Sequence, residues 1–244
     1  KMEENKQDAE VVDININEEP QEIPHVNLVI CTPGHSVTRA YLKSLLATIA
    51  ALSEENITWA HSNEFSSHVG DAREITLSGT LRNSLDEQRP FSGTLTYDKL
   101  MWIDSDIAWK PEDLLKLYHS DKDIVTGAYL LATGEVVAYK NILKKPFMFE
   151  EIKQETNMMK IEACGFGFVC VKQGVFESLT RPWFQAAIGT WKNDEGKEYK
   201  FPIMGEDISW CQRVLNEGYE IWLDPTVKVI HQKTMMLTWE GILP

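Results

Sequence analysis

Two aspartates one residue apart, Asp104 and Asp106, end an apolar run in the stretch "KLMWIDSDIAWK". Side chains at positions i and i+2 of an extended chain lie on the same face, so both carboxylates can converge on one cation. Hard divalent cations such as Mn²⁺ or Mg²⁺ prefer oxygen ligands and keep open positions for phosphate oxygens. The spacing therefore predicts a metal site. The alternative, in which the pair ends a strand as a solvated turn or helix cap, stays open.

Four further side chains have types that suit chemistry. Glu206 and Asp207 open a helix expected in "GEDISWCQRVLNEG", where they could act as acids or bases or simply cap the helix. His231 follows the apolar run "VKVI" as a metal ligand or as a polar residue at a strand end. Arg73 lies in the first turns of a helix predicted over residues 69–85, where it could reach a phosphate or form a surface salt bridge.

The elements that must position these side chains alternate between short β-branched runs and helical periodicity from residue 25 onward. This pattern predicts an α/β sheet with right-handed crossovers. In such a sheet the ligand crevice lies beyond the carboxyl ends of the strands. Asp104 and Asp106 come directly after a predicted strand, so they are expected at this crevice. After the first strand, residues 26–32, a helix is expected whose apolar stripe is Tyr41, Leu42, Leu45, Leu46, Ile49 and Leu52.

Length and composition limit the partners. The 244 residues, 43% of them hydrophobic, can bury a sizeable core, and we predict a single domain over residues 24–244. The net charge is −13 without a stripe of Lys and Arg, so no nucleic-acid partner is expected. The four cysteines lack the spacing of a structural zinc site, and no apolar run reaches the roughly 18 residues of a membrane span. We therefore expect a soluble, cytoplasmic protein without a transmembrane segment; a targeting segment upstream of Lys1 stays open.

Two segments stand apart from the pattern of strands and helices. Residues 1–23 hold eight acidic and two basic side chains and no aromatic one, which predicts a flexible acidic tail. Its alternating "VVDININ" could add an edge strand. Residues 181–207 hold turn-forming and charged residues, which predicts a loop that acts as a lid over the catalytic candidates or is simply solvated.

Three motifs occur in a characteristic order: "LMWIDSDIAWKPEDLLKL", then "EACGFGFVCVKQGVFESL", then "MGEDISWCQRVLNEGYEIWLDPTVKVIHQK". Together, over roughly residues 26–232, they resemble a nucleotide-sugar-dependent glycosyltransferase of the GT-A fold, close to the family 2 type. The resemblance implies a Rossmann-like mixed sheet of mainly parallel strands flanked by helices. It also implies a Mn²⁺ or Mg²⁺ cofactor, a nucleotide-sugar donor, most commonly a UDP-sugar, and a glycan or other hydroxyl acceptor.

The resemblance also implies roles for the acidic residues and the histidine. Asp104 would lie near the ribose or in the metal shell, Asp106 would bind the metal that bridges the diphosphate, and His231 would complete the shell. The metal would stabilise charge on the leaving nucleoside diphosphate. Of the acceptor-side pair Glu206 and Asp207, Asp207 would be the general base in an inverting transfer. Because a late metal histidine also occurs in retaining relatives, the stereochemistry stays open.

Donor contacts follow from the same resemblance. The first loop, "CTPGHS", would hold the base and ribose through Thr32 and Pro33, with Arg73 nearby. Gly165 and Gly167 in "CGFGF" would let the backbone approach the donor sugar. Apolar faces on which a sugar could stack are offered by Trp102, Trp109, Phe166, Trp183, Trp191 and Trp210, most of which are expected in the core.

Three other classes fit part of the pattern. A catalytically inactive nucleotide-sugar or glycan-binding module would have the same fold, but all the catalytic candidates are present. A phosphohydrolase resembling the haloacid dehalogenase group would carry D-x-D after its first strand with Thr or Val two residues beyond; here the pair follows the third strand and Ala108 stands at that place. Nucleotidyltransferases usually have a Gly-rich first loop with Arg and Lys, which "CTPGHS" lacks.

Overall fold

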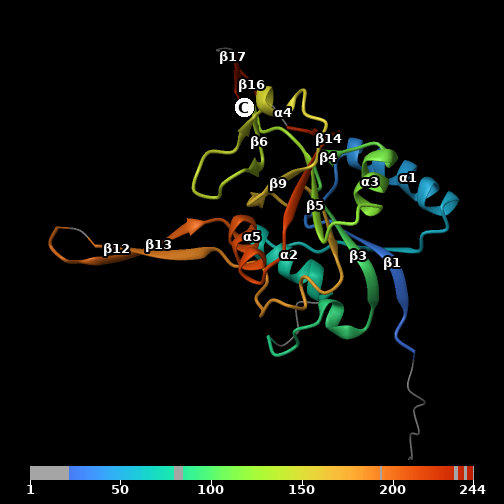
Figure 1. Cartoon of the computed structure of the whole chain (residues 1–244), viewed down its shortest axis with the longest axis horizontal. Helices are drawn as coiled ribbons and strands as arrows, with labels where there is room; N and C mark the ends of the chain where they lie inside the picture. Colours follow the sequence, from blue (N-terminus) through green and yellow to red (C-terminus); the bar gives the residue numbers. More distant parts are fainter. Residues whose placement is uncertain (1–21, 80–84, 193, 234–235, 239–240, 244) are drawn as a thin grey trace, which may run out of the picture.

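The computed structural model describes residues 22–79, 85–192, 194–233, 236–238 and 241–243, and it has a central sheet with helices on both faces (Figure 1). In spatial order the seven strands are β2 (Trp59–Ser62), β1 (His25–Cys31), β3 (Thr96–Ile103), β11 (Phe168–Lys172), β5 (Ile124–Ala128), β14 (Ile221–Lys228) and β9 (Met159–Ile161). Only β11 and β9 run antiparallel to their neighbours, so the other five strands point the same way. The predicted α/β sheet of mainly parallel strands is therefore confirmed.

Helices cover the two faces of this sheet in pairs. The helical segments are α1 (Arg39–Glu54), α2 (Val69–Ser78), α3 (Pro111–Tyr118), α4 (Phe149–Ile152), α5 (Glu206–Asn216) and the 3₁₀ segment η1 (Pro90–Gly93). Successive residues of a strand point to opposite faces. In β1, Leu28 and Ile30 belong to the core beneath α1 and α3, whereas Val29 and Cys31 belong to the core shared with α2 and α5. The helices that carry Arg73 and the acidic pair thus lie on the same face.

The buried face of α1 differs from the predicted apolar stripe. Leu42 and Leu46 are 47% and 60% exposed, and the small polar residues Ser44 and Thr48 are buried instead. The reason is hydrogen bonding to Trp109: its backbone N–H donates to Ser44 Oγ at 2.9 Å and its ring Nε1–H donates to Thr48 Oγ1 at 2.8 Å. Buried N–H groups need acceptors, so this helix turns its hydroxyls inward.

The helix α2 is shorter than the predicted span of residues 69–85. It ends at Ser78 because Gly79 adopts a left-handed conformation with φ of 80°, and its N–H donates to the carbonyl oxygen of Ile75. Glycine at this position ends many helices. Residues 80–84 of the predicted helix lie outside the described residues.

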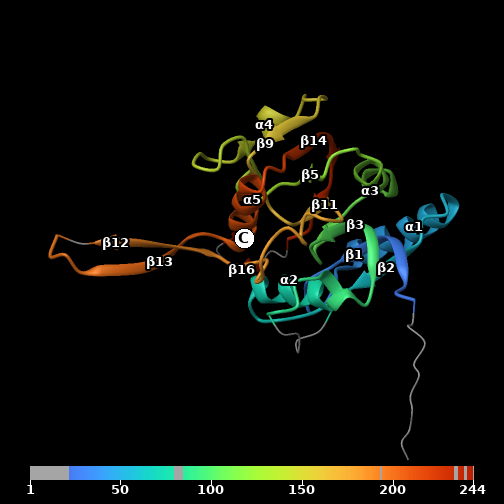
Figure 2. The same ribbon diagram turned by 60° about the horizontal axis from the view of Figure 1, so that its bottom comes forward.

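Five short pairs of strands lie outside the central sheet in the described part of the chain. They are β10 (Ala163–Cys164) with β7 (Ala138–Tyr139), β15 (Ile230–His231) with β4 (Ile107–Ala108), β6 (Glu135–Val136) with β8 (Phe147–Met148), β16 (Met236–Thr238) with β17 (Gly241–Leu243), and β12 (Ala187–Lys192) with β13 (Glu198–Met204). The last pair corrects the loop predicted over residues 181–207. It is a hairpin that projects away from the rest of the chain (Figures 1 and 2).

The structure bears only in part on the predicted acidic tail and on the predicted lack of a transmembrane segment. The acidic tail and its "VVDININ" strand lie outside the described residues, apart from residues 22 and 23, which are exposed. In the described part of the chain, no helix has the length and apolar character that a bilayer crossing requires.

Candidate active site

A cleft of about 370 Å³ lies at the carboxyl ends of the parallel strands. Pro33 enters it after β1, Asp104 and Asp106 after β3, and Tyr129 after β5. Asp207 enters from the start of α5, and His231 and Lys233 enter from β15 and the residues that follow it. The crevice thus forms at the edge expected for an open α/β sheet.

The two aspartates after β3 lie in a turn. The N–H of Ile107 donates to the carbonyl oxygen of Asp104 at 3.0 Å, which closes the turn. The side chains consequently take different partners: Asp104 pairs with Arg73, and Asp106 with His231 and Lys233. The expectation that both carboxylates share one face of an extended chain is therefore wrong, although both line the cleft.

Arg73 lies among three carboxylates and is 4% exposed. Its Nη2 donates to Asp104 Oδ1 at 3.3 Å, and its Nη1 donates to Glu206 Oε1. Burial acts to lower the pKa of Arg73, but the charges of Asp104, Asp207 and Glu206 together raise it. One buried cation therefore faces three acidic groups, and this cluster has an excess of negative charge.

Asp207 carries part of that excess. Burial raises its pKa, Arg73 acts in the opposite direction, and Glu206 raises it again. Its Oδ1 accepts the N–H of Ile208 at 2.8 Å. Asp207 lines the cleft, whereas Glu206 is held by Arg73. Asp207 thus has a position in the cleft and a raised pKa that suit proton transfer.

On the other side of the cleft, Asp106 is in contact with two basic groups. His231 Nε2 lies 3.2 Å from Asp106 Oδ2, and Lys233 Nζ donates to the same oxygen at 2.9 Å. Burial acts to raise the pKa of Asp106, but the bonds from His231 and Lys233 lower it to about 2. The bond to Asp106 in turn raises the pKa of His231. Two basic groups thus share this one carboxylate.

The hydrogen bonds of His231 test whether a metal would fit. Its Nδ1 lies 2.9 Å from the carbonyl oxygen of Leu130, which can only accept, so Nδ1 carries a proton. Nε2 then faces the carboxylate of Asp106, a contact that requires either a second proton or a cation. An Nδ1–H bond to a carbonyl is the usual support of a metal-binding histidine. The donor set of Asp106 and His231 therefore fits a divalent cation.

The third predicted ligand is directed elsewhere. Asp104 pairs with Arg73, and within the described ranges no group of three or more His, Cys, Asp or Glu side chains gathers to hold a metal ion. The ion would therefore have Asp106 and His231 as its protein ligands, and the remaining positions would be open to water or substrate.

In the first loop, Pro33 lines the cleft and Thr32 does not. The Thr32 side chain is fully buried, bonded to the hydroxyl of Tyr41 and lying 3.2 Å from His61 Nε2. The loop rests on the aspartate turn, since the N–H of Thr38 donates to the carbonyl oxygen of Ser105 at 3.0 Å. Of the two predicted donor contacts, the loop thus presents Pro33 to the cleft and directs Thr32 into the core.

The two glycines of "CGFGF" make room for a tyrosine that sequence analysis missed. A Cβ added to Gly165 would lie 2.2 Å from the hydroxyl of Tyr129, and one added to Gly167 would lie 2.6 Å from Tyr129 Cζ. The Tyr129 hydroxyl accepts the N–H of Gly167 at 3.2 Å. The ring is nearly perpendicular to that of His231, with centroids 5.5 Å apart. The glycines therefore shape the cleft wall through Tyr129.

Lys233 is the second cleft residue that sequence analysis missed. The available signal was position: Tyr129 directly follows a strand, and Lys233 follows the histidine by two residues.

The aromatic residues proposed as sugar platforms are mostly core, as expected. The buried ones are Trp102, Trp109, Phe166, Trp183 and Trp210. The side chain of Trp191 lies outside the described part of the structure.

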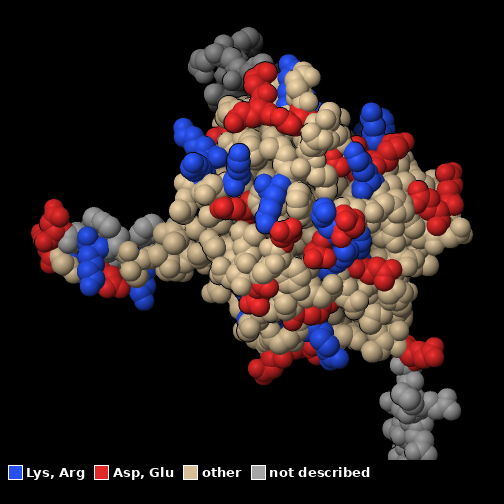
Figure 3. All heavy atoms as spheres, viewed as in Figure 1, with Lys and Arg blue, Asp and Glu red and all other residues tan. Residues whose placement is uncertain are grey.

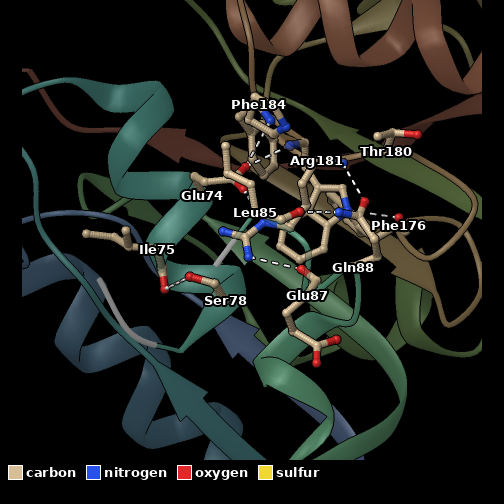
Figure 4. A network of polar contacts seen from close by, with 12 residues as sticks. Glu74, Ile75, Ser78, Leu85, Glu87, Gln88, Phe176, Thr180, Arg181 and Phe184 are labelled. Carbon is tan, nitrogen blue, oxygen red and sulfur yellow. Dashed lines mark hydrogen bonds and ion pairs between the residues drawn. The ribbon is translucent and has the colours of Figure 1, made fainter. Parts of the chain in front are cut away.

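A polar network around Glu74 of α2 and Arg181 (Figure 4) continues to α5. Glu74 of α2 accepts hydrogen bonds from Arg181 Nε at 2.7 Å and from the backbone N–H of Trp183 at 2.8 Å. From α5, Arg213 donates to the carbonyl oxygen of Trp183 at 2.9 Å. The segment before β12 thus links α2 to α5, and the network supports the contact of Arg73 with the acidic pair.

Comparisons with known proteins give a likeness of fold. No protein-family model matches the chain, and no curated protein sequence matches it. Among solved structures, A197 from STIV is similar with a TM-score of 0.50 and 18% identity over 86% of this chain and 95% of that chain.

Two more solved structures are similar at lower scores. The catalytic domain of Drosophila beta1,4-galactosyltransferase 7, in complex with xylobiose, has a TM-score of 0.47 and 12% identity over 86% of this chain and 71% of that chain. GalNAc-T7 with UDP, GalNAc and Mn²⁺ has a TM-score of 0.41 and 13% identity over 87% of this chain and 44% of that chain.

Proposed function

We propose that this chain is a metal-dependent glycosyltransferase that moves a sugar from a nucleotide-diphosphate donor, most simply a UDP-sugar, to a hydroxyl of a glycan or other acceptor. The observation that carries the proposal is the pairing of opposite environments in one cleft. A carboxylate with a raised pKa, Asp207, lines the same space as the basic group around Asp106. Sugar transfer needs both: a base for the attacking hydroxyl and positive charge for the leaving diphosphate.

On the acceptor side, Asp207 removes the proton of the attacking hydroxyl. Its raised pKa brings it closer to neutral pH, which suits a general base. Glu206 holds Arg73, and the guanidinium limits the rise in the pKa of Asp207, so the carboxylate stays available as a base. Attack by a hydroxyl activated in this way inverts the configuration of the transferred sugar.

On the donor side, Asp106 and His231 would hold a divalent cation, and Lys233 is placed to contact phosphate oxygens. A bound Mn²⁺ or Mg²⁺ would supply positive charge at the diphosphate. Arg73 and Asp104 line the same cleft, and Pro33 offers an apolar surface to the nucleotide. Tyr129, which is only 6% exposed, forms a buried part of the wall.

The test is transfer by the purified chain from a panel of nucleotide sugars, with Mn²⁺ or with EDTA. We expect turnover with Mn²⁺ only, and a loss of about 10²- to 10⁴-fold in kcat for Asp207→Asn. The matched control is Asp121→Asn, whose side chain is 84% exposed and does not line the cleft. Equal rates for Asp207→Asn and wild type would refute the assignment of the base.

A further inference from the structure

A second cavity, of about 380 Å³, lies outside the cleft and is rich in lysine. Lys140, Lys144 and Lys145 line it together with Phe147 and Glu151. All three lysines are exposed. In the space-filling view, several basic side chains lie near β6 and β9, below the acidic side chains over α4 (Figure 3). This lysine pocket, defined by the three lysines, has a volume in the range of small-molecule sites.

Three lysines against one carboxylate leave the lysine pocket with a net positive charge. Among the ion pairs of the described residues, none involves Lys140, Lys144 or Lys145. The one acidic residue of the pocket, Glu151, uses its carboxylate to accept the N–H of Met148 at 2.7 Å. By contrast, Lys160 on the adjacent edge strand lies 2.6 Å from a carboxylate oxygen. In a chain with a net charge of −13, this excess favours an anionic ligand.

The lysine pocket is connected to the acceptor side of the cleft by one short strand. Val137 lines the cleft, β7 follows, and Lys140 comes next, so about 10 Å of extended backbone separates the two cavities. Tyr139 lies on this strand; burial raises its pKa, and the charge of Asp207 raises it further. The strand therefore leads from the neighbourhood of the proposed base to the lysines.

We infer that the lysine pocket binds an anionic group, a carboxylate, sulfate or phosphate, on an acidic glycan acceptor whose reacting hydroxyl lies at Asp207. The inference rests on the proposed function and names its acceptor class. A nucleic acid is a poorer fit, because three lysines give a short basic patch on a chain that repels long polyanions. A flat membrane surface is also a poorer fit, because a concave pocket encloses a single charged group and cannot lie flush against a bilayer.

The test is calorimetric binding of a sulfated tetrasaccharide and of a neutral tetrasaccharide of the same length to the full chain. We expect the sulfated form to bind more tightly, with an affinity that falls as salt rises. The triple variant Lys140→Gln, Lys144→Gln, Lys145→Gln should weaken its binding about tenfold or more, since three charge contacts are lost. The control Lys43→Gln removes an exposed lysine of α1 and should leave binding unchanged.

The outcomes separate this inference from the proposed function. Equal binding of the sulfated tetrasaccharide by the triple variant and the wild type would overturn the inference, as would full competition by inorganic sulfate at the same concentration. The proposed function is measured apart, by Mn²⁺-dependent binding of UDP in the cleft, which the triple variant should retain. If UDP binding fails and lysine-dependent binding of the tetrasaccharide persists, the anion site stands and the function fails.

Discussion

The two aspartates of the D-S-D turn have opposite environments although one residue separates them. Asp104 belongs to a buried cluster in which one guanidinium, that of Arg73, interacts with three carboxylates. Asp106 lies on the more open side, where its carboxylate contacts both the imidazole of His231 and the ammonium group of Lys233. In the first region, burial and then Glu206 raise the pKa of Asp207; in the second, the bonds from His231 and Lys233 lower the pKa of Asp106. A spacing of two residues therefore does not imply a shared role.

The largest expected effect concerns the buried cluster. Arg73→Met would leave Asp104, Glu206 and Asp207 without their cation, and breaking a buried ion pair in this way costs about 3 to 5 kcal/mol of the free energy of unfolding. Urea denaturation measures it. The control Arg89→Met breaks a pair in which the arginine side chain is 63% exposed and should leave the transition near that of wild type. Similar transitions for both variants would contradict the cluster's structural importance.

The second effect separates the two aspartates by ligand binding. At one hundred times the dissociation constant, UDP with Mn²⁺ should stabilise the wild type by about 2.7 kcal/mol. Asp106→Asn should lose this stabilisation, because it removes a proposed metal ligand. Asp104→Asn should keep a Mn²⁺-dependent response, because its carboxylate is bonded to Arg73. The comparison would break if Asp104→Asn alone lost the response to Mn²⁺.

The third effect uses the network that joins α2 to α5. Glu74→Gln keeps an acceptor but removes the charge beside Arg181, so we expect a loss of about 1 to 2 kcal/mol in stability and a several-fold lower kcat. The affinity for UDP with Mn²⁺ should not change, because Asp106 is not part of this network. Glu54→Gln, an exposed change on α1, serves as the control. A changed UDP affinity together with an unchanged kcat would contradict the division into two regions.

The smallest effect is a shift in pH dependence. Asp207 acts as a base only when ionised, so the rate should rise with pH through its pKa, which burial and Glu206 raise above that of an ordinary aspartate. Glu206→Gln removes a negative neighbour and frees Arg73, and both changes lower the pKa of Asp207. The acid limb of kcat against pH should therefore move to lower pH. A limb that stays in place or moves to higher pH would argue against Asp207 as the titrating base.

Much of the site could be predicted because it depends on where strands end. The hydrophobic pattern predicted the buried run before Asp104 and Asp106 and a helix with Asp207 in its first turn, and these three aspartates do line one cleft. The direction of each side chain was not readable. A turn closed by Ile107 separates the two aspartates, and this depends on tertiary contacts with Arg73 and His231.

Other parts of the fold depended on partners that are distant in sequence. The inward face of α1 follows from the N–H groups of Trp109, which lies more than fifty residues away along the chain, so apolar periodicity favoured the wrong leucines. The glycines at 165 and 167 were noticed, but what they accommodate is Tyr129, almost forty residues earlier. The hairpin formed by β12 and β13 was missed because its turn-forming and charged composition resembled a loop.

The most direct test of the central claim is the thermal stability of the chain with UDP, GDP, CDP or dTDP, each with Mn²⁺ or with EDTA. The claim is that the basic region around Asp106 and His231 binds a nucleoside diphosphate together with a divalent cation. We expect one nucleotide, UDP first, to raise the transition temperature with Mn²⁺ and to have no effect with EDTA. If no nucleotide shifts the transition in the presence of Mn²⁺, or if the shift is the same with EDTA, the claim is contradicted.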